Sequence, residues 1–283
     1  MAVFLGVDGG GSGCRAAIAD AGGRVLGRGS AGPANVSTDM AGALENLRAA
    51  VTAAAAEAGV GGSDLAECPA HLGIAGVLRA DQALAVAQGL GLPRARVTDD
   101  RTTQLRGALG KDDGALVALG TGTIIGVQRA GRVRFAGGWG LVLSDEASGG
   151  WLGLRALSLT LEARDGLSLA SDLTTRLDQA LHGPAGIVAF AARATPADFA
   201  AHAPDVIAAA DTGDAVAVRL MREGAAYIAR TLRALGHAAG EPLCLTGGVG
   251  PAYRDFLPAE LGAACIKPRG SALDGALSLA REA

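Results

Sequence analysis

Short apolar runs separated by glycine-rich turns open the chain. Residues 2–8 form a strand-length apolar run that ends at Asp8, and two further runs follow at residues 14–19 and 24–29. Turn-forming residues separate all three runs, so the pattern predicts three consecutive strands. The glycine-rich segment 9–13 therefore joins two strands and does not begin a helix.

Helical and strand patterns alternate in the rest of the first half. An alanine-rich amphipathic pattern over residues 38–58 predicts a helix, with Ser37 or Thr38 as its N-cap. The elements expected after this helix are a strand at 71–76 that ends in a glycine turn, a helix near 80–90 and a short strand at 95–98. This order of elements is typical of an α/β half-molecule.

The opening pattern occurs a second time from residues 107–114 onward. Apolar runs at 115–119 and 124–128 flank the glycine segment 120–123, and a third strand is predicted at 133–135. The two copies have no useful sequence identity, but the order of strand, glycine loop and strand is the same. The pattern therefore predicts two α/β halves of related architecture.

Helical patterns fill most of the second half, from residue 147 to residue 239. The elements expected after them are strands at 243–246 and 262–266 and a helix from Ser271 to about Ala280. That last helix is expected to pack back on the first half. No low-complexity linker separates the halves, and the predicted domains are residues 1–106 with 270–283, and residues 107–269.

Composition excludes several classes of partner. The 283 residues carry a net charge of −3, so we expect no binding to nucleic acid or to an anionic membrane surface. No apolar run reaches the roughly 18 residues of a membrane span, and the first residues lack the basic segment of a signal peptide. The four cysteines are scattered without a C-x-x-C pair, which is typical of reduced thiols in a cytoplasmic protein.

The glycine segment after the first strand suggests nucleotide binding. It lacks the G-x-x-x-x-G-K-[ST] string of a P-loop, and Cys14 stands where a Rossmann fingerprint has its third glycine. It resembles the phosphate hairpin of the actin/hexokinase superfamily, in which glycine N–H groups approach the phosphates. The residues concerned are Asp8, Gly9, Gly10, Gly11 and Ser12. Asp8 is the candidate to hold Mg²⁺ through water, and a glycine hairpin without a ligand is the alternative.

Two further glycine segments strengthen the nucleotide interpretation. One follows a strand of the second half, as the first hairpin does in its own half, and consists of Gly120, Thr121, Gly122 and Thr123. Two such loops would hold a triphosphate from both sides. The other consists of Gly247 and Gly248, after the strand at 243–246, where glycines leave room for adenosine. Each segment alone is a common turn, but the three together predict ATP binding.

A carboxylate follows the short strand at 95–98. Asp100 lies just beyond the C-terminal end of this strand, where a catalytic base facing a cleft would be found. The alternative is an N-cap for a helix over residues 101–109, a role open to either Asp99 or Asp100. The sequence leaves both interpretations open.

A glycine-rich loop over residues 137–149 has polar groups suited to a sugar. Asp145 can accept two hydrogen bonds from sugar hydroxyls, and bonds to an ionised acceptor are the stronger kind. The alternative is that Asp145 caps the helix predicted from residue 147. Asn35 lies in a loop bordered by glycine and proline, and by itself it is only a turn residue.

These segments, in this order, resemble the BadF/BadG/BcrA/BcrD-type ATPase family, and within it the bacterial glucosamine kinases and N-acetylglucosamine kinases. The resemblance covers residues 6–279 and implies two ribonuclease-H-like α/β domains of the actin/hexokinase-like fold, with a nucleotide cleft between them. It implies that Asp100 is the general base. The residues it assigns to sugar hydroxyls are Asn35, Gly138 and Asp145. Ser144 and Ala147 depart from the family pattern, which usually has glycine at both positions.

The resemblance implies an ATP- and Mg²⁺-dependent kinase that phosphorylates the 6-hydroxyl of an amino-hexose. Glucosamine is favoured because the chain length and the C-terminal third are closer to the glucosamine kinases. The alternatives are an N-acetylglucosamine kinase, a kinase of another sugar and a non-kinase ATPase. The iron–sulfur activators of the family need cysteines beside the second glycine loop, and none occurs between Cys68 and Cys244. The expected partner is a small-molecule sugar, with a homodimer as the usual state of the family.

Overall fold

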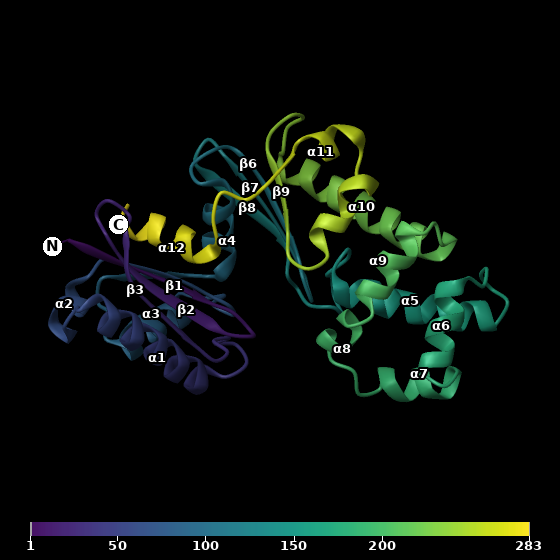
Figure 1. Cartoon of the computed structure of the whole chain (residues 1–283), viewed down its shortest axis with the longest axis horizontal. Coiled ribbons are helices and arrows are strands. Elements are labelled where there is room, and N and C mark those ends of the chain that lie inside the picture. Colours follow the sequence, from purple (N-terminus) through teal and green to yellow (C-terminus); the bar gives the residue numbers. More distant parts are fainter. Residues whose placement is uncertain (1, 283) are drawn as a thin grey trace. The chain divides into compact units, whose positions relative to one another are not determined.

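The computed structural model describes residues 2–282, which divide into two compact units (Figure 1). The first unit contains the described residues up to Asp112 and those from Pro268 onward, and the second is Asp113–Lys267. Residues 1 and 283, which the predicted first domain includes, lie outside the described range. Each unit is built on its own five-stranded mixed sheet.

The sheet of the first unit has the strand order β3-β2-β1-β4-β5. Its antiparallel part is β1 (Val3–Gly9), β2 (Cys14–Asp20) and β3 (Val25–Ala31), and its parallel part is β4 (Ala70–Ile74) and β5 (Ala95–Thr98). The glycine segment after β1 therefore joins two antiparallel strands, as the sequence predicts. β1 lies in the middle of the sheet, so its C-terminal end brings Asp8 next to the ends of β2 and β4.

Helices cover both faces of this sheet (Figure 1). The helices of the unit are α1 (Met40–Ala58), α2 (Gly62–Glu67), α3 (Ala80–Leu90), α4 (Asp100–Leu109) and α12 (Ala272–Ala280). α1 and α3 pack on one face, while α4 and α12 pack against each other on the opposite face. The expectation that the last helix returns to the first half is confirmed, because Leu273 and Leu277 of α12 pack against Ala17 and Ala19 of β2.

The N-cap predicted for α1 is wrong. The helix begins at Met40, and its cap is Asp39 rather than Ser37 or Thr38. The Asp39 carboxylate accepts a hydrogen bond from the N–H of Gly42 at 3.0 Å. Aspartate and serine are comparable caps, so local preference alone does not separate these neighbouring residues.

The sheet of the second unit repeats the connectivity of the first. Its strands are β6 (Gly114–Leu119), β7 (Thr123–Arg129), β8 (Arg132–Gly137), β9 (Leu243–Thr246) and β10 (Cys265–Ile266). The order is β10-β9-β6-β7-β8, with β6, β7 and β8 antiparallel and β9 and β10 parallel to β6. The predicted repetition of strand, glycine loop and strand is confirmed, with β6 and β7 in the roles of β1 and β2.

Helices make up the rest of the second unit. They are α5 (Gly149–Arg164), α6 (Asp172–Ala180), α7 (Pro184–Ala191), α8 (Pro196–Ala200), α9 (Ala203–Asp211), α10 (Ala215–Leu235), the 3₁₀ helix η1 (Gly250–Phe256) and α11 (Ala259–Ala263). The strand predicted at 262–266 is too long, because only its last two residues are extended. The N–H groups of Leu261 and Gly262 turn back to the carbonyl of Pro258, which forms the helical turn α11.

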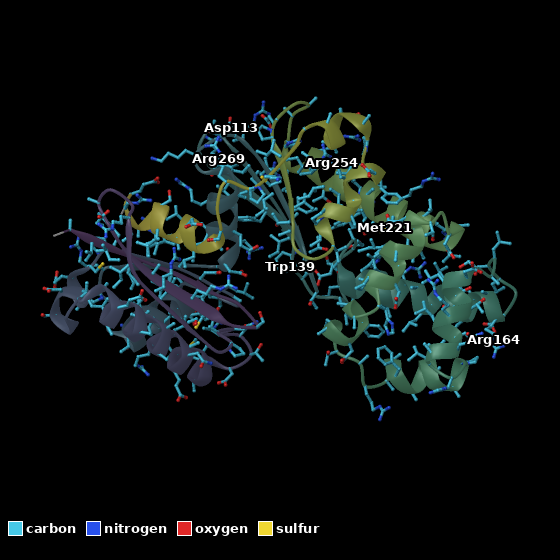
Figure 2. All side chains as sticks on the ribbon, viewed as in Figure 1. Asp113, Trp139, Arg164, Met221, Arg254 and Arg269 are labelled. Atoms are coloured by element: carbon cyan, nitrogen blue, oxygen red, sulfur yellow. The ribbon has the colours of Figure 1, made fainter. Side chains whose placement is uncertain are left out.

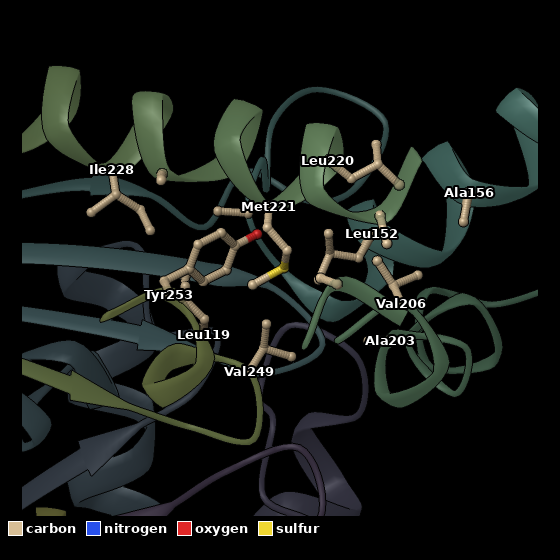
Figure 3. Packing of buried hydrophobic residues seen from close by; sticks show 14 of the residues in the cluster. Leu119, Leu152, Ala156, Ala203, Val206, Leu220, Met221, Ile228, Val249 and Tyr253 are labelled. Atoms are coloured by element: carbon tan, nitrogen blue, oxygen red, sulfur yellow. The ribbon is translucent and has the colours of Figure 1, made fainter. Parts of the chain in front are cut away.

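The core of the second unit anchors two of the glycine segments. Leu119, the last residue of β6, and Val249, which precedes η1, are buried in the same cluster as Met221 of α10 and Tyr253 of η1 (Figure 3). Burial of a side chain such as Leu119 stabilises the fold by about 1.5–3 kcal/mol. The glycine loop 120–123 follows Leu119 directly, and Gly247 and Gly248 directly precede Val249. Burial of Leu119 and Val249 therefore fixes where both glycine segments leave the sheet.

None of the helices within residues 2–282 is both long enough and apolar enough to cross a bilayer.

Candidate active site

Backbone hydrogen bonds hold the hairpin between β1 and β2. The Gly10 N–H donates to the carbonyl of Gly13 at 2.9 Å, which closes the turn. The Gly10 carbonyl accepts from the N–H of Ala34 at 2.8 Å, and the Gly9 carbonyl accepts from the N–H of Ala75 at 2.7 Å. The hairpin is thus attached to the segments that follow β3 and β4.

The glycines of this hairpin differ in what the fold requires of them. A Cβ on Gly9 would lie 2.8 Å from Cδ1 of Ile74, so a side chain there would require the buried Ile74 to shift. A Cβ on Gly11 would meet no atom of residues 2–282 within 4 Å, and neither Gly10 nor Gly11 has a positive φ. Folding therefore does not demand glycine at 10 or 11, and both positions leave the backbone open to a ligand from solvent.

Asp8 lies on β1 directly before the hairpin. It faces Arg15 in the antiparallel register of β1 and β2. Burial raises the pKa of the Asp8 carboxyl, and the nearby Arg15 guanidinium lowers it in part. Asp8 is therefore a partly buried carboxylate at the mouth of a glycine hairpin.

The structure shows which of Asp99 and Asp100 caps helix α4. Helix α4 begins at Asp100, and its N-cap is Asp99, whose Oδ1 accepts from the N–H of Thr102 at 3.3 Å. The other carboxylate oxygen of Asp99 forms an ion pair with Arg101. Capping is accordingly the role of Asp99, which leaves the Asp100 carboxylate available for other chemistry.

The Asp100 carboxylate has a strongly shifted pKa. Burial raises its pKa to about 6, and the negative charges of Asp99 and Asp8 act in the same direction. Its Oδ2 accepts a hydrogen bond from Nε2 of Gln104, one helical turn along α4, at 3.0 Å. The sequence interpretation missed Gln104, although the spacing of four residues on one helix was the available signal.

Asn35 lies where the segment after β3 meets the segment after β4. Its Oδ1 accepts from the N–H and the hydroxyl of Ser37 at 3.0 and 2.8 Å, so the turn uses the amide oxygen. A Cβ on Gly76 would lie 2.4 Å from that oxygen, which explains the glycine in the turn after β4. The amide nitrogen of Asn35 is the part of the side chain that remains to donate to a ligand.

In the second unit, the loop between β6 and β7 is held by two other segments. The N–H groups of Gly149 and Gly150, which begin α5, donate to the carbonyls of Gly120 and Thr121 at 2.8 and 3.2 Å. The segment after β9 approaches the base of the same loop, where the Val249 N–H donates to the Leu119 carbonyl at 3.0 Å.

Gly247 must be glycine for this approach. Its φ is +80°, and a Cβ there would lie only 2.2 Å from the carbonyl oxygen of Leu119. Gly120 and Gly248 differ from it, because a Cβ on either would meet no atom of residues 2–282 within 4 Å. The second and third glycine segments are thus neighbours in the fold, and each keeps one open glycine.

Asp145 connects the loop after β6 with the loop after β8. Its carboxylate accepts from the N–H of Thr123 at 3.3 Å and from the N–H groups of Gly138 and Gly140. Only 6% of Asp145 is exposed, and burial is the largest cause of its raised pKa. A Cβ on Gly122 would lie 2.9 Å from Oδ2 of Asp145, so this glycine makes room for the carboxylate.

Asp145 is not the cap of α5. The cap is Ser148, whose hydroxyl accepts from the N–H of Trp151 at 3.0 Å. Asp145 and Ala147 both have left-handed backbone, with φ of 67° and 69°. The family's usual glycine at 147 would adopt this conformation without strain, and alanine pays a steric penalty for it.

Apolar side chains project from the loop that Asp145 holds. Trp139 lies between Gly138 and Gly140 (Figure 2). Its exposed fraction is 66%, and Val142 and Leu143 further along are almost fully exposed. The interpretation of this loop from sequence considered only its polar groups and did not include these apolar residues.

The candidate residues thus fall into two groups, one on each unit. Those of the first unit are Asp8, Gly9, Gly10, Gly11, Ser12, Asn35 and Asp100. Those of the second unit are Gly120, Thr121, Gly122, Thr123, Gly138, Asp145, Gly247 and Gly248. Within residues 2–282, no group of three or more His, Cys, Asp or Glu side chains is arranged to hold a metal ion.

Two α/β units with the same sheet connectivity and a glycine hairpin after the first strand define the actin/hexokinase-like fold. A ROK family glucokinase from Streptomyces griseus has this fold, with a TM-score of 0.55 and 21% identity over 99% of this chain and 100% of its own. Within that class, the chain belongs to the BadF/BadG/BcrA/BcrD ATPase family, whose model matches residues 5–276.

Two relatives resemble the chain over nearly its whole length. The glucosamine kinase GspK of Vibrio cholerae is 31% identical over 283 residues, which cover 99% of this chain and 96% of the relative. A Chromobacterium violaceum protein of known structure, described as a candidate N-acetylglucosamine kinase, is 36% identical. Its TM-score to this chain is 0.86, with 99% of each chain covered.

Proposed function

We propose that this chain is an ATP-dependent kinase that transfers the γ-phosphoryl group of ATP to the 6-hydroxyl of an amino-hexose, with glucosamine as the favoured substrate. Its membership of an ATPase family and its full-length similarity to a glucosamine kinase support this proposal. We further propose a cytoplasmic enzyme that acts on a free sugar and forms a homodimer.

The observation that carries the proposal is that the Asp100 carboxylate does not cap α4 and has a raised pKa. Because Asp99 caps α4, the Asp100 carboxylate is not needed there, and its pKa of about 6 is suited to a general base near neutral pH. In the proposed reaction, the sugar O6 attacks the γ-phosphorus and Asp100 accepts the hydroxyl proton. The O6–P bond forms as the bond from phosphorus to the bridging oxygen of ADP breaks.

We assign phosphate binding to the glycine loops. Gly9, Gly10, Gly11 and Ser12 form one loop, and Gly120, Thr121, Gly122 and Thr123 form the other. The open space beside Gly11 and Gly120 supports this assignment, because a side chain there would obstruct the ligand and not the fold. Gly247 and Gly248, which lie beside the second loop, are assigned to the adenosine part of ATP.

The first hairpin has a carboxylate of the kind that binds Mg²⁺ together with a nucleotide. Magnesium is usually bound by one or two carboxylates together with substrate phosphates and water, not by a cage of protein ligands. Asp8 would hold Mg²⁺ through water. The raised pKa of Asp8 shows that burial disfavours its negative charge, and a nearby cation would stabilise that charge. When bound with ATP, Mg²⁺ neutralises charge on the phosphates.

We assign the sugar hydroxyls to Asn35, Gly138 and Asp145. The free amide nitrogen of Asn35 can donate a hydrogen bond, and Asp145 has about one acceptor position left beyond its three backbone N–H partners. N-acetylglucosamine is the second candidate substrate, favoured by the similarity to the Chromobacterium violaceum protein.

Turnover on a panel of sugars tests the proposal. ADP release is followed with glucosamine, N-acetylglucosamine, glucose, gluconate and glycerol, and the phosphorylated position is read from the NMR spectrum of the product. We expect the highest kcat/KM with an amino-hexose and phosphate on O6. Equal kcat/KM for all five compounds would contradict the substrate assignment, and ADP release that no sugar stimulates would indicate a non-kinase ATPase.

A further inference from the structure

One side-chain hydrogen bond within the first unit fixes the carboxylate assigned as the base. Gln104 and Asp100 are four residues apart on α4, so both side chains lie on the same side of the helix. Nε2 of Gln104 donates to Oδ2 of Asp100 at 3.0 Å. The contact brings an uncharged donor to a carboxylate whose acidic neighbours are Asp99 and Asp8.

Other hydrogen bonds near Asp100 involve the Asp99 side chain and the Asp100 backbone. Asp99 is held by the N–H of Thr102 and by Arg101, as a cap and an ion pair. The Thr103 hydroxyl donates to the backbone carbonyl of Asp100 at 2.9 Å. Gln104 differs from Thr102 and Thr103 because its hydrogen bond is to the Asp100 carboxylate itself.

We propose that Gln104 is a positioning residue for the phosphoryl transfer. By holding Oδ2, it restricts rotation of the Asp100 carboxylate and leaves Oδ1 as the oxygen that receives the proton of the acceptor hydroxyl. This inference rests on the proposed function. A base that must meet a hydroxyl at hydrogen-bond distance loses much of its effect when its orientation is free, because misplacement by about 1 Å can cost 10²-fold in rate.

The test replaces Gln104 by methionine, which has similar length and helix propensity but cannot donate. We expect Gln104→Met to lower kcat by roughly 10- to 100-fold, while KM for sugar and for ATP stays near the wild-type value, because neither substrate loses a contact. Gln88→Met is the matched control, since Gln88 lies on α3 on the opposite face of the sheet, and it should keep wild-type kcat. Gln104→Asn, which keeps the amide but is one methylene too short, should show the same loss as Gln104→Met.

A double-mutant cycle separates positioning from a structural effect. If Gln104 acts through the Asp100 carboxylate, adding Gln104→Met to Asp100→Asn should cause no further loss of kcat. If Gln104 had only a general structural role, Gln104→Met would lower kcat by the same factor in the wild-type and in the Asp100→Asn enzyme, and that result would overturn the proposal. Gln104→Met and Gln104→Asn with wild-type kcat would also overturn it, even where Asp100→Asn is inactive. An active Asp100→Asn enzyme would instead contradict the proposed function.

Discussion

Asp99 and Asp100 are adjacent in sequence but bind different partners. Oδ1 of Asp99 accepts the N–H of Thr102 at 3.3 Å and caps α4, while Oδ2 of Asp100 accepts Nε2 of Gln104 at 3.0 Å. Because Asp99 meets the need of the helix for a cap, Asp100 can occupy the first helical position with a carboxylate that is not part of the cap. This division of roles makes the two residues separable by experiment.

The pH dependence of the rate tests the state of Asp100. A general base works only when ionised, and burial with the charges of Asp99 and Asp8 raises the pKa of Asp100 to about 6. We therefore expect kcat/KM for the sugar to fall as the pH drops through this value and to be constant above it. A rate that stays constant down to about pH 4, where an unperturbed carboxyl titrates, would argue against Asp100 as the base.

Asp99→Asn should move this acid limb to lower pH. Asparagine is a comparable N-cap, so the helix remains capped, but the negative charge that raises the pKa of Asp100 is removed. The pH profile of the variant is the measurement, and a limb that stays in place or moves to higher pH would contradict the electrostatic explanation.

The glycine loops should separate ligand binding from folding. Gly11→Val and Gly120→Val place a side chain in open space, so stability should be unchanged. Loss of even one hydrogen bond to a charged phosphate should raise Kd for ATP by roughly 10-fold or more. Calorimetric titration of ATP with Mg²⁺ measures this, and unchanged affinity in a folded variant would rule out the loop concerned.

Gly122→Ala is the contrasting variant for this experiment. Its Cβ would lie 2.9 Å from Oδ2 of Asp145, so the substitution should reduce thermal stability as well as ATP affinity. If Gly122→Ala were as stable as Gly11→Val, the close approach of Asp145 to the loop would be in doubt.

Ala147 offers a test of backbone strain in the loop before α5. Its φ of 69° is unfavourable for alanine and free of penalty for glycine. Ala147→Gly relieves this strain but also removes a fully buried methyl group, so the two effects on the free energy of unfolding oppose each other. Ala156→Gly, inside α5, is the control, because it removes an equally buried methyl group and relieves no strain; it should therefore lower the free energy of unfolding by about 1 kcal/mol more than Ala147→Gly does. Chemical denaturation measures both, and a loss of stability in Ala147→Gly equal to that of the control would contradict the strain.

The parts of the fold set by local chemistry could be predicted from the sequence. Glycine segments between apolar runs marked both hairpins, and the repeated pattern indicated two related sheets, because turn residues and strand periodicity act over a few positions. The strand predicted at 262–266 was too long because Gly262 and Ala263 belong to the helical turn α11, whose N–H groups turn back to the carbonyl of Pro258. The cap of α1 was misplaced by one or two residues for lack of a local preference between Asp39 and its neighbours.

The contacts inside the candidate site depend on tertiary structure. The sequence suggested Asp145 as a sugar ligand or a helix cap, and neither interpretation included its bonds to the N–H groups of Thr123 and Gly138. These partners lie in separate loops that only the sheet brings together. The choice between Asp99 and Asp100 depended on a helix start that sequence patterns do not define to one residue.

Asp100→Asn tests the central claim most directly. Asparagine has nearly the same shape and cannot accept a proton, and positioned general bases are typically worth about 10²–10⁴-fold in rate. We expect kcat with the preferred amino-hexose to fall by at least about 10²-fold, while thermal stability and calorimetric ATP affinity stay near wild type. An Asp100→Asn enzyme that keeps wild-type kcat would contradict the assignment of Asp100 as the base.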